Sequence, residues 1–227
     1  MNNSHTALLR GHPAPNPGIV ALVFAALFIA GLVPVTNLTD TVHFPSPLQP
    51  AAEIEAYFST HMTRVGFCAA LQFGSTIALG IFTATMVSRL RFLGVRVAGV
   101  EIALFGGIAA ALMTMVASTG QWALSRPGVG DDGRLARALY QLVFIAGGPG
   151  YTVPLGLLCA GIAVPSLFAK LLPRGLAWAG LVIAAVGELS ALSLVIPGAL
   201  FLVPLTRFPA FVWLAWAGFE LPKRSGA

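Results

Sequence analysis

The sequence predicts an all-α membrane protein, a polytopic bundle of transmembrane helices, and three observations support this prediction. Hydrophobic residues make up 57% of the 227 residues and charged residues only 9%, whereas a soluble domain carries about 25% charged residues. The apolar residues fall into long stretches that polar segments separate. The basic residues gather at the ends of these stretches, as they do where helices leave a membrane. We therefore expect a single membrane domain over residues 19–221, with six spans.

The N-terminal region is predicted to hold a tail and the first span. Residues 1–18 are polar and rich in Pro and Asn, so we expect a flexible cytoplasmic tail. Residues 19–36 carry no charge, and their length favours a membrane span. The alternative is a secretory signal peptide, but the stretch is long for one and lacks a small-x-small cleavage pattern.

The longest polar segment, residues 37–63, is predicted to contain one short helix. Its first half is rich in proline, which keeps the chain extended. After Pro50, the residues Ile54, Tyr57 and Phe58 recur at three- and four-residue spacing, with Glu and Ser between them. This spacing is typical of an amphipathic helix that lies on the membrane surface or leads into the second span.

The remaining apolar stretches predict five further spans and two further polar segments. A second polar loop is expected over residues 121–138, between the third and fourth spans, and a cytoplasmic tail over residues 222–227. The spans are predicted at residues 65–88, 97–120, 139–168, 176–196 and 199–220.

The distribution of Lys and Arg predicts the orientation of the bundle. Six spans place both termini on one side of the membrane, and eight Lys and Arg residues fall on that side against four on the other. Cytoplasmic segments carry such an excess, so we expect cytoplasmic termini and an inner (plasma) membrane location. The eight residues are Arg10, Arg89, Arg91, Arg96, Lys170, Arg174, Lys223 and Arg224; the four are Arg64, Arg126, Arg134 and Arg137.

The last two spans each carry one charge in their interior, at matched distances from the turn that joins them. Glu188 lies nine residues before Pro197, and Arg207 lies nine residues after Gly198. At about 1.5 Å per helical residue, both lie roughly 14 Å below the turn, so we expect an ion pair. This pair is either a functional polar centre or a permanent lock between neighbouring helices. In another alternative the last helix begins only near Pro209, which leaves Arg207 in a loop.

The predicted fourth span contains a cluster of residues that should break its helix. Gly147, Gly148 and Gly150 occur with Pro149 and Pro154 within eight residues. A broken helix at membrane depth needs protein or water to cover its freed carbonyl groups, and transporters build binding sites at such breaks. The alternative is that these glycines only allow helices to pack closely.

Depth along the helices predicts that these features converge. Counted from the outer ends of their spans, Gln72 and the glycine cluster reach about the same level as Glu188 and Arg207. We therefore expect Gln72, Gly147, Gly148, Gly150, Glu188 and Arg207 to form a polar centre in the outer half of the bundle.

Several chemistries find no support in the sequence. The basic residues do not form one soluble face, so we expect no nucleic-acid partner, and Cys68 and Cys159 lie within apolar stretches as packing residues. No span contains a histidine or a central lysine, which excludes haem held by paired histidines and a retinal Schiff base. No metal-ligand or nucleophile–base constellation is present, so we expect no cofactor and no enzymatic activity.

The order of features resembles a family of uncharacterised bacterial six-span membrane proteins, domain of unknown function 4386. The resemblance rests on the acidic segment that leads into Tyr57-Phe58-Ser59-Thr60-His61, on Arg89 and Arg91 after the second span, and on Leu172-Pro173-Arg174-Gly175-Leu176-Ala177-Trp178-Ala179-Gly180. It covers most of residues 19–221 and implies no activity, because the family has none assigned.

Together these patterns favour a non-enzymatic, multi-pass membrane protein whose first partner is the lipid bilayer. We expect it to bind or pass a small solute or lipid through the polar centre, as a small transporter does. The alternative is a sensory or partner-binding module that transports nothing, in which Glu188 and Arg207 form a purely structural pair.

Overall fold

The computed structural model describes residues 14–36, 44–46 and 48–222 of the chain, and these residues form helices and connecting segments without any strand. The predicted tails over 1–18 and 222–227 lie largely outside this part. The helices are α1 (Pro17–Leu32), α2 (Ala51–Thr60), α3 (Met62–Phe92), α4 (Ala98–Leu124), α5 (Gly133–Gly147), α6 (Pro149–Phe168), α7 (Arg174–Leu189) and α8 (Leu202–Glu220), with the 3₁₀ turns η1 (Ser190–Leu194) and η2 (Pro197–Phe201) between α7 and α8.

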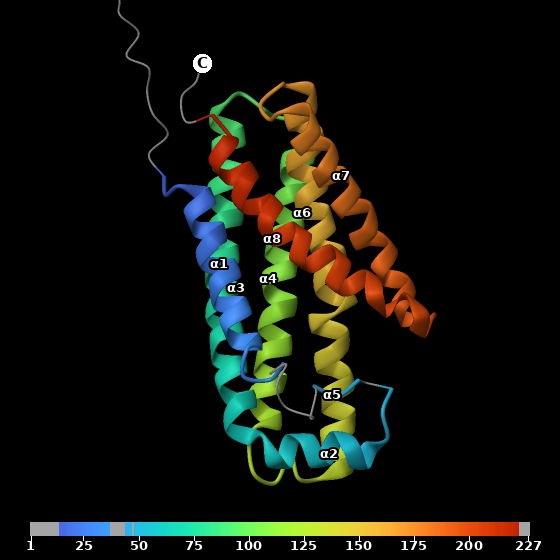
Figure 1. The fold of residues 1–227 in the computed structure, drawn as a ribbon. Helices are drawn as coiled ribbons and strands as arrows, with labels where there is room; N and C mark the ends of the chain where they lie inside the picture. Colours follow the sequence, from blue (N-terminus) through green and yellow to red (C-terminus); the bar gives the residue numbers. More distant parts are fainter. Residues whose placement is uncertain (1–13, 37–43, 47, 223–227) are drawn as a thin grey trace, which may run out of the picture.

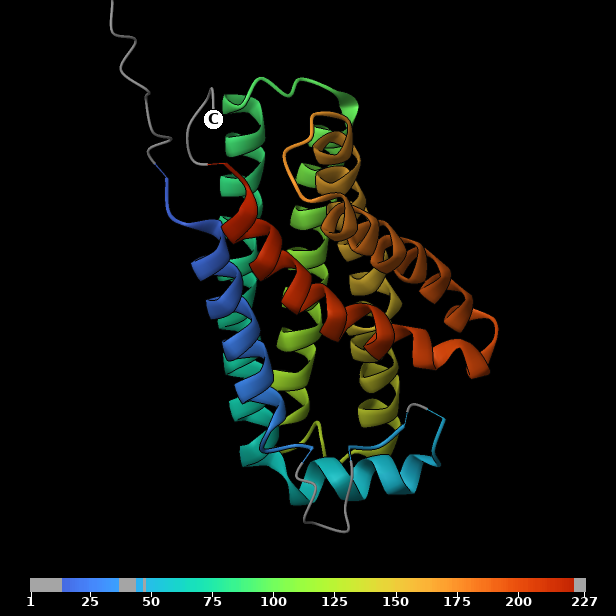
Figure 2. The same cartoon turned by 45° about the horizontal axis from the view of Figure 1, so that its top comes forward.

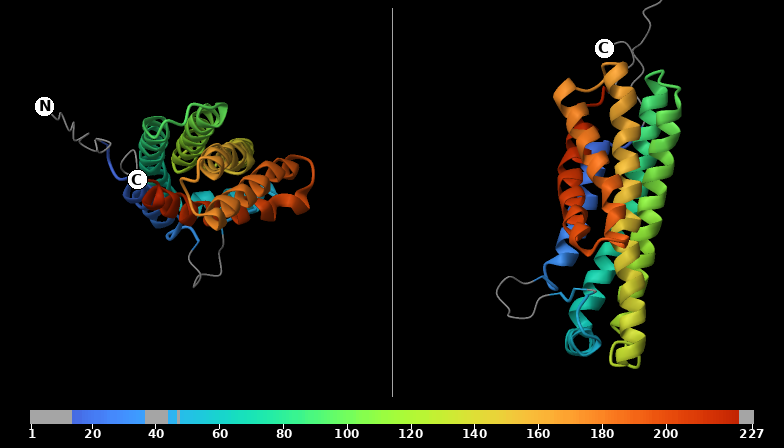
Figure 3. Two further views of the ribbon diagram at one scale, coloured as in Figure 1. Left: turned by 90° about the horizontal axis from the view of Figure 1, so that it is seen from above. Right: turned by 90° about the vertical axis from the view of Figure 1, so that its right-hand side faces the viewer.

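The long helices form a bundle in which neighbours in sequence are mostly neighbours in space. Helices α3 and α4 and the α5–α6 pair run side by side along the length of the molecule (Figure 1). Helix α8 returns from the tip of the α7–α8 hairpin to pack against α1 (Figure 2). Helix α2 lies across one end of the bundle, and the hairpin tip leans away from the other helices (Figure 3).

Five helical segments are long and apolar enough to cross a membrane, which agrees with a multi-pass membrane protein. They correspond to the second to sixth predicted spans. The α5–α6 pair, α7 with the following 3₁₀ turn, and α8 with the preceding 3₁₀ turn each count as one segment. The remaining apolar helix, α1, has 16 residues. At 1.5 Å per residue it is about 24 Å long, less than the roughly 30 Å of a bilayer's hydrocarbon core.

The first and last helices meet at the same end of the bundle. Gly218 of α8 lies against the backbone of Pro17 and Gly18, where an added Cβ would come within 2.8 Å of the Gly18 Cα. The ring of Phe219 likewise fills the space beside Gly18. The start of α1 and the end of α8 are therefore side by side.

Small residues allow the long helices to approach one another closely. A Cβ added to Gly106 of α4 would lie 2.5 Å from the Leu158 amide nitrogen of α6. Gly107 faces Thr83 of α3, and Gly156 faces the Ala184 carbonyl of α7. These contacts carry the van der Waals packing that holds helices together in lipid, where no hydrophobic effect drives their association.

Several predicted boundaries need correction. Helix α1 ends at Leu32 and not at residue 36, and α3 extends beyond the predicted 65–88 at both ends. Helix α4 continues to Leu124, so the predicted outer loop loses its first four residues, and α5 begins at Gly133, six residues before the predicted start of the fourth span. Helix α8 begins at Leu202 and continues through Pro209. The alternative in which the last helix begins near Pro209 is therefore wrong, and Arg207 lies within the helix.

The amphipathic helix predicted after Pro50 is confirmed as α2, and its buried residues are Ile54, Tyr57 and Phe58. They pack towards α5, so α2 closes the end of the bundle opposite to the start of α1.

We predict that a single methyl group at Gly106 destabilises the protein, whereas the same change at Gly80 does not. Gly106→Ala forces the backbones of α4 and α6 apart, and overpacking of this kind costs about 1–3 kcal/mol. Nothing lies within 4 Å of a Cβ at Gly80, so Gly80→Ala gains helix propensity without a clash. Thermal unfolding of both purified variants in detergent measures the difference, and equal melting temperatures would contradict this account of the α4–α6 contact.

Candidate functional site

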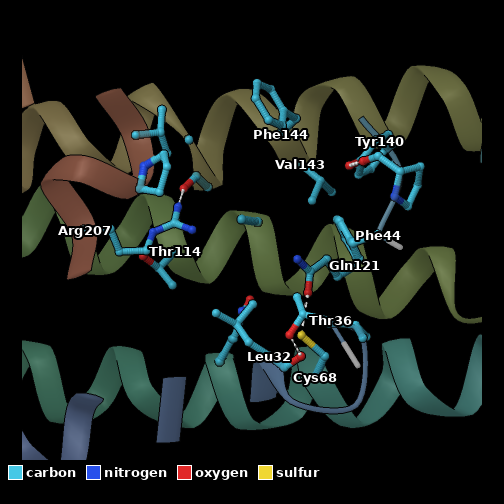
Figure 4. Close-up of a pocket in the computed structure, with 18 of the residues that line it drawn as sticks. Leu32, Thr36, Phe44, Cys68, Thr114, Gln121, Tyr140, Val143, Phe144 and Arg207 are labelled. Atoms are coloured by element: carbon cyan, nitrogen blue, oxygen red, sulfur yellow. Dashed lines mark hydrogen bonds between the residues drawn. The ribbon is translucent and has the colours of Figure 1, made fainter. Parts of the chain in front are cut away.

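A cavity of about 340 Å³ lies in the half of the bundle nearer to α2. Its walls come from α1, α3, α4, α5 and α8, and the segment before α2 closes it on one side. Most of the wall is apolar, with Phe28, Leu32 and Val143 among its residues, and the polar groups are few (Figure 4). Binding sites for small molecules have this size and composition.

The helix break predicted in the fourth span forms one wall of the cavity. Gly148 separates α5 from α6 with φ −90° and ψ −112°, outside the helical region, and Pro149 has no N–H to continue the ladder. In an unbroken helix the Tyr151 N–H would bond to the Gly147 carbonyl, four residues back. Here it bonds to the Gly148 carbonyl at 3.1 Å. The break therefore presents the Gly147 carbonyl to a new partner.

Arg207 supplies that partner from α8. Its Nη2 donates a hydrogen bond to the Gly147 carbonyl oxygen, which the close-up shows as a dashed line (Figure 4). The guanidinium carbon lies 5.2 Å from the ring centroid of Phe28 and 5.3 Å from that of Tyr151, both within range of a cation–π interaction. Arg207 Nε is buried and has no hydrogen-bond partner. The side chain is half-buried and lines the cavity.

Four of the six predicted site residues come together at the cavity. Gln72, Gly147, Gly148 and Arg207 all line it, although they come from α3, from the α5–α6 break and from α8. Gly150 lies just beyond the break and is not in the wall; an added Cβ there would face the Ile145 carbonyl of the preceding turn at 2.8 Å.

The predicted ion pair between Glu188 and Arg207 is not formed, so this expectation is wrong. Glu188 is exposed, and within the described part of the chain its carboxylate makes no ion pair or hydrogen bond. Its Oε1 lies beside Gly156 of α6 instead, 3.4 Å from where a Cβ would stand. The depth argument assumed two regular α-helices joined at Pro197. The two 3₁₀ turns between α7 and α8 have a rise of about 2.0 Å and three residues per turn, which changes both depth and facing.

Sequence reasoning missed the polar residues that α4 contributes. Thr114 and Gln121 are buried and line the cavity, and Gln121 Oε1 accepts a hydrogen bond from Cys68 Sγ at 3.6 Å. The third span was predicted to end at residue 120, which left Gln121 in the outer loop. The seven-residue spacing of Thr114 and Gln121, two helical turns on one face, was the available signal.

An aromatic cluster covers the end of the cavity that is farthest from Arg207. It consists of Phe44, Tyr57, Phe58 and Tyr140, with ring centroids 5.7 Å apart for Phe44 and Tyr140 and 5.2 Å apart for Phe58 and Tyr140. Tyr57 donates its O–H to the Val35 carbonyl at 3.2 Å, and burial raises the pKa of Tyr57 to about 12, so it stays a neutral donor.

The Tyr140 side chain ties this cluster to the segment before α2. Its hydroxyl donates to the Pro45 carbonyl, and the side chain is buried. The predicted start of the fourth span at residue 139 places Tyr140 at a span end. The structure places it under α2, because α5 begins earlier than predicted and carries this residue into the bundle.

Among the described residues, the cavity therefore offers the guanidinium group of Arg207, the amides of Gln72 and Gln121, a few hydroxyl groups and otherwise apolar walls. No group of three or more His, Cys, Asp or Glu side chains that could hold a metal ion occurs among the described residues. These groups can hold a small molecule by shape, hydrogen bonding and one positive charge.

Comparison with known proteins gave no match: no family model, no curated protein and no solved structure matches this chain. The resemblance to domain of unknown function 4386 therefore stays a prediction, and the function is argued from the site alone.

We predict that Glu188 and Arg207 are energetically independent. Glu188→Gln should change the free energy of unfolding by less than about 0.5 kcal/mol, because it removes no contact of the carboxylate. In a double-mutant cycle with Arg207→Gln, the coupling energy should stay below about 0.5 kcal/mol, as for sites that share no partner. Unfolding in mixed detergent micelles measures all four proteins. If the double variant recovers the stability that each single variant loses, Glu188 and Arg207 are coupled, and this prediction is wrong.

Proposed function

We propose that this chain is a six-span inner-membrane protein with cytoplasmic termini that binds a small solute or lipid in the cavity at Arg207. The observation that carries the proposal is the convergence of Arg207, Gln72 and the α5–α6 break on one cavity of about 340 Å³. A large apolar cavity with a few convergent polar groups is the feature that most often marks a binding site.

Two observations support the six-span topology with α1 as a short crossing. Pro17 and Gly18 pack against Gly218 and Phe219, which agrees with an even number of crossings. The excess of eight over four Lys and Arg residues favours cytoplasmic termini. In this topology the cavity lies in the outer half of the bundle, and α1, with about 24 Å of helix, is accommodated by local thinning of the bilayer.

The second candidate is a partner-binding module without a ligand. Two hydrogen bonds at the α2 end of the cavity favour it. Tyr57 of α2 donates to the Val35 carbonyl just after α1, and Tyr140 of α5 donates to the Pro45 carbonyl before α2. In such a module the polar residues would pair with one another and hold the helices together. Glu188 and Arg207 do not pair, however, and a cavity lies beside Arg207. Ligand binding, with or without transport, accounts for both features and is preferred.

We expect Val203→Phe to abolish binding and the matched change Val212→Phe to leave it intact. Both residues are on α8, but Val203 lines the cavity one turn from Arg207, whereas Val212 is 67% exposed to the surroundings of the bundle. A phenyl ring at 203 occupies the space that a ligand needs. Purified wild-type protein is first screened by thermal shift against small solutes and single-chain lipids, and the compounds that stabilise it are then tested on both variants. If a compound still stabilises the Val203→Phe variant, its binding site lies outside this cavity. If no compound stabilises the wild type, the proposal of a binding protein is contradicted.

A further inference from the structure

Among the residues that the structure describes, no acidic side chain neutralises the positive charge of the cavity. Arg207 is the one charged side chain in the described part of its wall, and Glu188, on the other helix of the hairpin, is exposed. Arg207 Nη2 donates to the Gly147 carbonyl, and Arg207 Nε has no partner among the described residues. A charge held at membrane depth without a counterion is costly, so an anion that enters the cavity would be strongly favoured.

The rest of the wall fits an apolar body rather than a polar one. Phe28, Leu32, Val143 and Phe144 contribute side chains without hydrogen-bonding groups. Of the two amides, Gln121 already accepts a hydrogen bond from Cys68. A sugar or a zwitterion would leave most of its polar groups unsatisfied in such a cavity, which costs more than it gains.

A second hollow lies directly beside the cavity and faces the surroundings of the bundle. It has a volume of about 280 Å³ between the hairpin turn and α5, and it shares two residues of its wall, Phe144 and Leu200, with the Arg207 cavity. Its rim carries Ile145, Leu194 and Val195, which are 47%, 60% and 82% exposed. In a protein that spans a membrane, apolar residues with this exposure face lipid, so the hollow opens towards acyl chains.

We propose that the ligand is a single-chain anionic amphiphile, such as a fatty acid, that reaches the cavity from the lipid phase. Its acidic head group pairs with Arg207, and its chain passes between Phe144 and Leu200 into the hollow below the hairpin turn. This inference rests on the proposed function, since it assigns the ligand class and the route of access to the same cavity. A soluble organic anion shares the head-group chemistry but not the need for the hollow.

The head group is tested with probes that share a twelve-carbon chain and carry a negative, a neutral or a positive head group. The full-length protein in phosphatidylcholine nanodiscs is given dodecanoate, dodecanol or dodecyltrimethylammonium at equal mole fraction, and the melting temperature is measured. We expect dodecanoate alone to raise it. Arg207→Gln should weaken the apparent affinity about tenfold or more, a change of about 1.4 kcal/mol, and Arg207→Lys should keep part of it. The comparison of probes on the wild type does not depend on how well these variants fold.

The route is tested at the shared wall. Leu200→Trp should reduce the effect of dodecanoate but not that of benzoate, a soluble anion that needs only the head-group site. Leu205→Trp, at a 50% exposed position that lines neither hollow, is the matched control.

The remaining outcomes separate this inference from the proposed function. If all three dodecyl probes stabilise the wild type equally and Val203→Phe abolishes this effect, the ligand binds in the cavity but need not be an anion. That result would overturn this inference and leave the proposed function standing. If benzoate alone stabilises the wild type, the ligand is a soluble anion, and both the amphiphilic ligand and its entry from the lipid phase are wrong. If none of the four probes stabilises the wild type, the inference fails, and the wider solute screen decides the proposed function separately.

Discussion

The hydrogen bond from Arg207 to the Gly147 carbonyl is the interaction on which the arrangement of the membrane domain depends. In a bilayer each backbone polar group must find its partner within the protein. The non-helical Gly148 turns the Tyr151 N–H to the Gly148 carbonyl and so deprives the Gly147 carbonyl of its partner in the helix, and α8 replaces that partner with a guanidinium group. The break and the charge are therefore parts of one arrangement, and each would be costly without the other.

The cavity exists because helices of unequal length share one bundle. Helix α3 has 31 residues and α1 has 16, so α1 covers only part of α3 and ends short of its α2-side end (Figure 1). The start of α8 and the cluster around Tyr140 cover the space beyond α1 from other directions, and a cavity remains between them. Close packing at Gly106 and Gly156 keeps the rest of the bundle tight, which confines the space to one half.

The distribution of charge gives this space its chemical character. Within the described part of the chain, Arg91 and Glu101 form an ion pair at 2.7 Å, near the ends of α3 and α4 where both side chains are exposed. It needs no ligand and, as an exposed pair, contributes little. Arg207 differs because its partner among the described residues is a backbone carbonyl and not a carboxylate, so its charge stays available to a bound molecule. This difference, rather than the presence of charge in a span, identifies the site.

The sequence by itself determined the properties that depend on composition and local pattern. These are the helical class, the spans longer than 18 residues, the amphipathic α2 and the break at Gly148, because hydropathy, three- and four-residue spacing and the missing N–H of proline act within one segment. Only the tertiary structure decided which side chains meet. Glu188 and Arg207 lie at equal sequence distances from Pro197, yet the 3₁₀ turns between α7 and α8 alter rise and rotation, and Arg207 instead meets a carbonyl 60 residues away in the chain. Gln121 and Tyr140 likewise face the cavity because α4 ends later and α5 begins earlier than their own residues indicate. Such pairings follow from helix ends and crossing geometry, which depend on all packed neighbours together and not on any single stretch.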